Sequence, residues 1–301
     1  MTYSEIWHRI ATSYDDGEAR AIARILIEEL FGLSYTDIVC GATEQLSADD
    51  TLRLDTAVRR IEQGEPLQHV LGYADFCGNR FCVNGSVLIP RPETEWLVDE
   101  GAKLMSGCIA SDEMQHKAPH SPKRILDIGT GSGCIAISLK LRLGDAYVEA
   151  WDISEEALRT AQDNADALKA EVVFRKRDAL RADNTAAPWD LIVSNPPYIC
   201  DSERSAMDDN VLLHEPHTAL FVPDDDPLRF YRAIARYALL TLNIGGSLLF
   251  ECNTRYAEAT GTMLSDMGFE EVTVSDDCFN LPRFVRGRKN SPSQPSPSGR
   301  A

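Results

Sequence analysis

The sequence predicts an α/β protein: a mostly parallel sheet covered by helices, preceded by a small helical bundle and joined to it by a β-hairpin. From residue 123 onward, short apolar runs alternate with longer segments of helical periodicity. Such alternation is characteristic of a parallel sheet with helices on both faces. Residues 1 to 70 show helical periodicity only, and the stretch that follows alternates apolar and polar residues as a hairpin does.

The helical bundle is predicted over residues 1–70. Ala19 to Phe31 carries apolar residues at helical spacing, and Gly32 can end this helix. Ser47 begins another helix, with Asp50 three residues later in a pattern that resembles a capping box. Because this region has no strand signal, we expect a separate small domain.

Residues 71–92 are predicted to form a hairpin linker. Apolar and polar residues alternate on either side of Gly78-Asn79, which can supply the turn. Pro90 and Pro92 then force an extended chain. We expect the next helix to begin at Glu93 or Thr94.

Residues 93–288 are predicted to form the α/β domain, and the Ser/Pro-rich residues 289–301 a disordered tail. Residues 106–122 lack periodicity and are expected to form an exposed loop. The remaining pattern predicts strands at 124–128, 148–151, 172–175, 191–194, 247–250, 271–274 and 284–287, and helices at 133–142, 155–168, 228–242 and 256–267.

Composition narrows the class of protein. The 301 residues carry a formal net charge of -17, which disfavours a nucleic-acid partner unless a local basic patch overrides it. The eight cysteines include no CxxC pair, so we expect reduced thiols and no metal site. The N-terminus lacks the features of a signal peptide, and apolar stretches are shorter than the ~20 residues of a membrane span. These features predict a cytoplasmic protein with no membrane association, and we expect a monomer.

A glycine-rich turn provides the clearest local signal of a cofactor site. The predicted strand 124–128 runs directly into Gly129, Thr130, Gly131, Ser132 and Gly133, after which a helix begins. Alternating glycines allow a tight turn and a close approach of ligand to backbone. The spacing departs from the G-x-G-x-x-G of dinucleotide-binding proteins.

Acidic residues follow the next two predicted strands. Asp152 lies about 20 residues beyond the glycines, where a ribose diol would bind, and Asp178 is placed to meet an adenine amino group. Ligands bind in this crevice of open α/β sheets. Because no basic residue lies in the glycine turn to meet a pyrophosphate, a sulfonium cofactor without phosphates, S-adenosylmethionine, fits better than a dinucleotide.

The run Asn195, Pro196, Pro197 and Tyr198 follows the strand at 191–194 and predicts the catalytic site. Two prolines make a rigid turn that presents the Asn195 side chain and the Pro196 carbonyl as acceptors. An amide or aromatic amine nitrogen is a poor nucleophile because its lone pair is delocalised. Two acceptors directed at its N–H groups would stabilise the charge that develops during methyl transfer and orient the nitrogen.

The motif itself leaves the acceptor open, because it also occurs in adenine-N6 methyltransferases that act on DNA or RNA. Such an enzyme would need a basic, aromatic surface, which this acidic chain does not show. A non-catalytic protein that only binds the cofactor is the other alternative, and the intact run from Asn195 to Tyr198 argues against it.

Four segments together resemble the HemK-like release-factor glutamine methyltransferases: residues 72–81, 88–95, 195–198 and 214–220. The resemblance covers nearly all of residues 20 to 287, and the run Ile-Pro-Arg-Pro-Glu-Thr-Glu at 89–95 is highly specific. It implies a Rossmann-like, class I methyltransferase domain. It also implies a helical N-terminal domain that binds peptide chain release factors, and methylation at N5 of the glutamine in their Gly-Gly-Gln loop.

Carried over by position, the resemblance assigns Gly129 to Gly133 to the methionine part of the cofactor and Asp152 to its ribose. It assigns Asn195 to Tyr198 to the glutamine amide, with Asn195 also expected to contact the cofactor. Arg91 and Glu93 are expected to bind substrate, and the residues from Glu93 to Glu95 would line or brace the site.

Two departures from the family pattern stand out. Ala179 occupies a cofactor-binding position where the family often has an aromatic residue that packs on adenine. Cys252, Asn253 and Tyr256 replace the Ile-Gly and later Gln that often follow Glu251.

Overall fold

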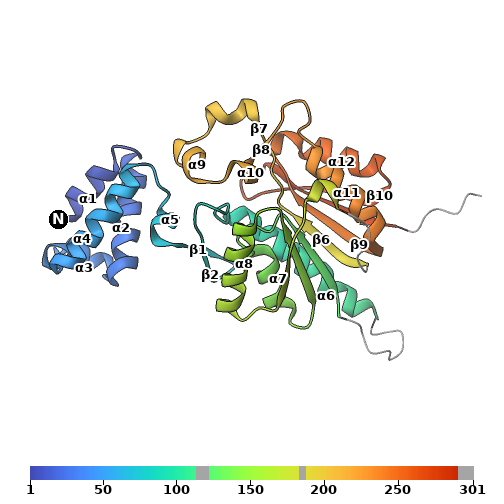
Figure 1. Ribbon diagram of the computed structural model, residues 1–301, viewed down its shortest axis with the longest axis horizontal. Coiled ribbons are helices and arrows are strands. Elements are labelled where there is room, and N and C mark those ends of the chain that lie inside the picture. Colours follow the sequence, from blue (N-terminus) through green and yellow to red (C-terminus); the bar gives the residue numbers. More distant parts are fainter. Residues whose placement is uncertain (113–121, 183–187, 291–301) are drawn as a thin grey trace, which may run out of the picture.

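The computed structural model describes residues 1–112, 122–182 and 188–290. Helices occupy the N-terminal end of the chain, and a sheet with helices on both faces makes up most of the remainder (Figure 1). The α/β class with a mostly parallel sheet is confirmed. Within the described residues, no helix combines the length and the apolar character needed to cross a membrane.

The N-terminal region is helical throughout its regular elements. These are α1 (Tyr3–Ile10), α2 (Asp16–Phe31), α3 (Tyr35–Val39), η1 (Ala42–Gln45), α4 (Ala48–Glu62) and α5 (Leu67–Leu71). Gly32 ends α2 in the left-handed conformation, with φ of 66°, and the Ser47 hydroxyl caps α4 by accepting the Asp50 N–H at 3.1 Å. Apolar faces of α1, α2 and α4 meet around Ile10 and Leu26, forming a core separate from that of the sheet.

A short hairpin of β1 (Tyr73–Phe76) and β2 (Asn79–Cys82) follows. The predicted turn at Gly78-Asn79 is wrong by one residue, because Asn79 already pairs with Phe76 in the ladder. Cys77 and Gly78 make the turn instead, with positive φ values of 49° and 74° that suit a tight two-residue hairpin.

The main sheet has seven strands in the order β10-β11-β9-β6-β3-β4-β5. Its parallel strands are β3 (Arg124–Ile128), β4 (Tyr147–Asp152), β5 (Val172–Lys176), β6 (Trp189–Ser194) and β9 (Leu242–Glu251). At one edge β10 (Phe269–Asp276) and β11 (Pro282–Lys289) run antiparallel. The chain starts at β3, builds outward to β5, and then returns to place β6 on the other side of β3. This reversal creates a crevice at the carboxyl ends of β3 and β6, where open α/β sheets bind ligands.

Successive strand residues point to opposite faces and form two cores. Ile125 belongs to the face covered by α6 (Glu95–Asp112), α7 (Cys134–Leu143) and α8 (Glu155–Leu168). Leu126 belongs to the face covered by α11 (Arg229–Thr241) and α12 (Ala257–Asp266). The strands between these layers are buried on both sides, which explains their continuous apolar runs.

The loop expected at 106–122 is wrong over residues 106–112, because α6 continues to Asp112. Ser106 and Gly107 are exposed, so the apolar spacing of the preceding turns is interrupted there and does not reveal that the helix continues. An established helix can add such turns because each further residue gains one backbone hydrogen bond. Residues 113–121 of that expected loop and residues 291–301 of the expected tail lie outside the described residues.

Between β6 and α11 the chain forms small elements that the sequence pattern did not reveal. They are β7 (Ile199–Cys200), η4 (Asp201–Ala206), α9 (Asp209–His214), α10 (His217–Leu220) and β8 (Phe221–Val222). β7 and β8 pair in parallel, which brings the end of α10 back beside the strand-end crevice.

Candidate active site

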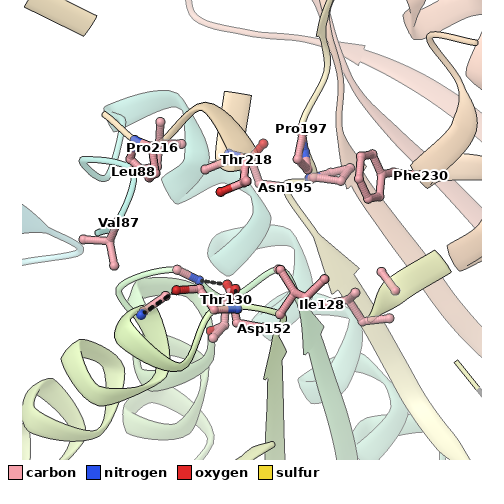
Figure 2. A pocket seen from close by; sticks show the side chains of 18 of the residues that line it. Val87, Leu88, Ile128, Thr130, Asp152, Asn195, Pro197, Pro216, Thr218 and Phe230 are labelled. Carbon is pink, nitrogen blue, oxygen red and sulfur yellow. Dashed lines mark hydrogen bonds between the residues drawn. The ribbon is translucent and has the colours of Figure 1, made fainter. Parts of the chain in front are cut away.

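A cavity of about 370 Å³ lies at the carboxyl ends of β3, β4 and β6, within the size range of small-ligand and cofactor sites. Its lining draws on the glycine turn, the corner after β6, the segment after the hairpin, α10 and α11. Figure 2 shows the opposed sides of this cavity, with Thr130 and Asp152 on one and Asn195, Pro197, Phe230, Leu88, Pro216 and Thr218 around the other.

The glycine turn is built as the sequence predicted. Gly129, Gly131 and Gly133 all have positive φ, of 78°, 54° and 81°, which other residues adopt only at a cost. A Cβ on Gly133 would lie 2.9 Å from the Ile137 side chain, so this glycine also permits close packing behind the turn. A Cβ on Gly129 would lie 4.0 Å from the Asn195 carbonyl oxygen, which places the turn directly opposite the corner after β6.

Asp152 ends β4 beside this turn and lines the cavity. Its carboxylate accepts the Gly131 N–H at 2.9 Å and the Ser154 N–H at 2.9 Å. Burial raises the pKa of Asp152 despite these hydrogen bonds. Each carboxylate oxygen has two acceptor positions, so Asp152 can also accept hydrogen bonds from a ligand diol while it fixes the turn.

Asp127, within β3, lies outside the cavity lining but holds the glycine turn, although the sequence pattern assigned it no role. It is fully buried and accepts the Thr130 hydroxyl at 2.6 Å. Burial raises its pKa to about 7. The available signal was an acidic residue inside an otherwise apolar strand, where it would be expensive to bury without a purpose.

Asp178 and Ala179 also line the cavity. Asp178 precedes η3 (Ala179–Arg181) and accepts the Leu180 N–H at 2.8 Å, so it caps this short helix as well. Apolar lining comes from Ile153 and Leu180, while Ala179 also packs against the core beneath α11. Aliphatic side chains therefore line the cavity around Ala179, the position where the family often has an aromatic residue.

The corner after β6 is tied to the glycine side. The Ser194 hydroxyl donates to the Ile128 carbonyl at 2.6 Å and links the two strand ends. Asn195, Pro196 and Pro197 line the cavity. Tyr198 lies outside the lining, and its hydroxyl donates to Glu251 Oε1 at 3.2 Å. Burial, and then the nearby Glu251 carboxylate, raise the pKa of Tyr198.

Arg91 lines the cavity and forms an ion pair with Glu215, whose side chain is only 1% exposed. Glu215 also accepts the Ile89 N–H at 3.1 Å. This carboxylate therefore joins the segment after the hairpin to the start of α10. Glu93, predicted to bind substrate with Arg91, lies outside the lining of the cavity.

Several residues that complete the site were not foreseen as individual contributors. Thr94 lines the cavity and receives a hydrogen bond from Asn195. Asn164 of α8 donates to the carbonyls of Ser132 and Cys82 at 2.9 and 3.0 Å, which joins the glycine turn to the hairpin. For Thr94 the sequence signal was the run at 89–95. For Asn164 the sequence offered no signal, because its hydrogen-bond partners lie far away in the chain.

This fold and this site define an S-adenosylmethionine-dependent methyltransferase of the Rossmann-like class. Residues 95–220 match the family described as methyltransferase small domain, and residues 8–72 match the PrmC N-terminal domain. Among solved structures, a methyltransferase from Pyrococcus furiosus is similar in fold, with a TM-score of 0.50 at 13% identity over 81% of this chain and 100% of that one.

Curated relatives make the assignment more specific. The release factor glutamine methyltransferase of Bacteroides thetaiotaomicron is 42% identical over 277 residues, covering 92% of this chain and 95% of the relative. The protein of the same name from Flavobacterium psychrophilum is 36% identical over 281 residues, covering 92% and 94%. The chain belongs to the family of release factor glutamine methyltransferases.

Proposed function

We propose that this protein transfers a methyl group from S-adenosylmethionine to the N5 amide nitrogen of the glutamine in the Gly-Gly-Gln loop of a peptide chain release factor. One observation carries the proposal: the corner at Asn195 and Pro196 lines the same cavity as the glycine turn, and a Cβ added to Gly129 would lie 4.0 Å from the Asn195 carbonyl oxygen. An acceptor pair for an amide is thereby held beside the cofactor position. The names of the curated relatives support the release factor as the substrate.

The lining fits the cofactor. S-adenosylmethionine supplies, when bound, a methyl group on a positively charged sulfur. The Asp152 carboxylate lines the cavity beside the turn, where a negative charge favours a cationic ligand and disfavours a pyrophosphate. We assign the residues from Gly129 to Gly133 to the methionine part, Asp152 to the ribose hydroxyls, and Asp178 with Ala179 to the adenine.

The corner after β6 orients the substrate. A glutamine amide nitrogen presents two N–H groups, and the corner offers two oxygens, Asn195 Oδ1 and the Pro196 carbonyl. Accepting both N–H groups stabilises positive charge that develops on nitrogen, and it holds the nitrogen in one direction. Because this charge is stabilised by acceptors, no base has to remove a proton before attack. The N–C bond forms as the C–S bond of the cofactor breaks, and the methylated amide nitrogen then releases one proton to solvent while S-adenosylhomocysteine leaves. Apolar side chains such as Leu88 and Phe230 exclude water from the cavity.

The remaining predicted residues support the corner from behind. We propose that Tyr198 braces the turn through its hydrogen bond to Glu251, and that Pro197 restricts its backbone. Arg91 holds the opposite wall through Glu215. Glu93 would contact the release factor at the rim instead of the glutamine itself.

We further propose that residues 1–70 bind the release factor and that 71–92 join them to the catalytic domain. This domain was expected at 93–288, but it includes Lys289 as the last residue of β11, so a tail can begin only after it. The matched PrmC N-terminal domain supports the first assignment. The net charge of -17 favours a protein partner over a nucleic acid. A release factor works on ribosomes, so we propose a cytoplasmic enzyme, acting as a monomer.

The test is incubation of the protein with isotopically labelled cofactor and purified release factor, followed by mass spectrometry of the Gly-Gly-Gln peptide. We expect one labelled methyl group on the glutamine. A release factor whose glutamine is replaced by alanine is the matched control and should stay unlabelled. Label in duplex DNA or RNA offered in parallel, with none in the release factor, would contradict the proposal.

A further inference from the structure

A buried hydrogen-bonded chain lies behind the acceptor corner. The Asn195 side-chain Nδ2 lies 3.3 Å from Thr94 Oγ1, and Thr94 Oγ1 lies 2.7 Å from Glu251 Oε2. Thr94 is 3% exposed and Glu251 is 1% exposed. These three residues come from the end of β6, from η2 (Pro92–Thr94) and from the end of β9. No role in binding cofactor explains why a carboxylate is buried at the end of β9, because Glu251 lies outside the cavity lining.

The direction of each hydrogen bond follows from counting protons. An ionised carboxylate can only accept, so the single hydroxyl proton of Thr94 points to Glu251. Thr94 Oγ1 can then offer only a lone pair to Asn195. The Asn195 amide must turn its NH2 group toward Thr94, and its carbonyl oxygen Oδ1 consequently faces away from Thr94.

We propose that Thr94 and Glu251 are positioning residues for methyl transfer, which fix the Asn195 amide so that Oδ1 is presented to the substrate N–H. This inference rests on the proposed function and adds the reason why Asn195 acts as an acceptor. Without the chain, the two ends of the amide could exchange, and its NH2 group would then oppose the N–H groups of the glutamine.

The same carboxylate fixes the far end of the turn. Glu251 Oε1 accepts the Tyr198 hydroxyl at 3.2 Å, so one buried group holds both ends of the segment from Asn195 to Tyr198. Tyr231 adds a hydrogen bond to the Glu251 carbonyl at 3.2 Å, which keeps the strand end in place.

The ionisation of Glu251 matters to this arrangement. Burial raises the pKa of Glu251, and the nearby Glu93 acts in the same direction. Hydrogen bonds from Thr94 and Tyr198 and the positive charge of Arg283 act against that rise. A protonated Glu251 could donate to Thr94 and reverse the chain. We therefore expect kcat to fall as the pH falls through the pKa of Glu251.

The test compares Thr94→Val, which removes the hydroxyl at nearly constant volume, with Thr94→Ser, which keeps it. Thr241→Val is the matched control, because Thr241 is also 3% exposed and its hydroxyl bonds to Tyr237, and neither residue lines the cavity. We expect kcat for release factor methylation to fall about 10- to 100-fold in Thr94→Val, with the substrate KM and the cofactor Kd changed by less than about twofold. Thr94→Ser should restore turnover, and Thr241→Val should match the wild type.

A second readout does not depend on activity. The side-chain NH2 resonances of Asn195, observed by nitrogen-15 NMR, should shift in Thr94→Val and stay in place in Thr241→Val. Glu251→Gln provides a further variant if Thr94→Val fails to fold, and it should also lower kcat. Should Thr94→Val keep wild-type kcat and unchanged Asn195 resonances, the positioning role is wrong while the proposed function stands. If the wild type leaves release factor unmethylated, the proposed function is wrong, and the resonances alone decide whether the chain orients Asn195.

Discussion

The two sides of the active-site cavity are built in different ways. The cofactor side, from the glycine turn through Asp152 to Asp178 and Ala179, lies within one continuous stretch of alternating strands and helices, from β3 to η3. The substrate side combines residues that are far apart in the chain: Thr94 and Glu251 are separated by 157 positions, and Arg91 and Glu215 by 124. The comparison shows that residues close together in the sequence can bind a cofactor that many proteins share. A particular substrate amide requires contacts that only the whole fold brings together.

This difference predicts separable effects of substitution. Changes on the cofactor side should alter cofactor binding, and changes on the substrate side should alter turnover or the stability of the wall. The following experiments test that separation, beginning with the largest expected effect.

Asn195→Ala should lower kcat by about 10²- to 10³-fold, the loss typical of removing one oriented group that stabilises developing charge. The cofactor Kd should stay nearly constant, because the glycine turn and Asp152 are unchanged. Labelled methyl transfer and calorimetric titration measure the two quantities. Asn243→Ala is the control, since Asn243 is exposed, its side chain donates to Asp190 Oδ1 at 3.0 Å, and it does not line the cavity. Unaltered turnover in Asn195→Ala would contradict the proposed role of Asn195 as an acceptor for the substrate amide.

Arg91→Ala should lower the free energy of unfolding by about 3 kcal/mol, because it leaves the buried Glu215 carboxylate without its cation. Urea denaturation at neutral pH measures this change. Arg236→Ala, on the exposed face of α11, should alter stability by less than about 0.5 kcal/mol. Equal effects of the two variants would show that the Arg91–Glu215 pair does not stabilise the wall.

Asp152→Ala should weaken cofactor binding by about 10- to 100-fold, the equivalent of one or two hydrogen bonds to a charged group. It loses a ligand acceptor and also releases the Gly131 N–H that it now fixes. Titration with cofactor measures the Kd, and the exposed Asp163→Ala on α8 is the control. A normal Kd with reduced turnover would contradict the division between the two sides.

Asp127→Asn should remove a pH dependence of stability. The pKa of Asp127 is raised by burial to about 7, from an ordinary value of 3.8. The native state therefore keeps its proton at pH values where the unfolded state has released it, and stability falls as pH rises toward 7. From pH 5 to 7 the wild type should lose about 2 kcal/mol relative to Asp127→Asn. Urea unfolding at both pH values measures this, and parallel changes in the two proteins would contradict it.

Part of the fold could be predicted from the sequence because some helix boundaries depend only on residues close to them in the chain. Gly32 and Ser47 end and begin helices through their own conformation and capping, so these boundaries were predictable. The end of α6 was not predictable, because the apolar spacing is interrupted at the exposed Ser106 and Gly107 while the helix continues. The hairpin turn was displaced by one residue because Cys77 adopts a positive φ that composition does not indicate.

The residues of the candidate site likewise include some that the sequence could predict and some that it could not. The glycines from Gly129 to Gly133 were identifiable because backbone conformation and strand order dictate residue type at a turn of this kind. Tyr198 could be singled out as part of a motif, but its direction toward Glu251 instead of the cavity depends on a strand more than 50 residues later.

By itself, the sequence determined the α/β class, the glycine turn with its following acids, and the rigid corner at Asn195, since each depends on residues adjacent in the chain. Only the tertiary structure decided that Thr94 and Glu251 meet behind that corner and that Arg91 pairs with Glu215. The physical reason is that burial and the hydrogen-bond partners of a side chain are properties of packing between distant segments. A local pattern fixes which groups are present, and the assembled fold fixes which way they point.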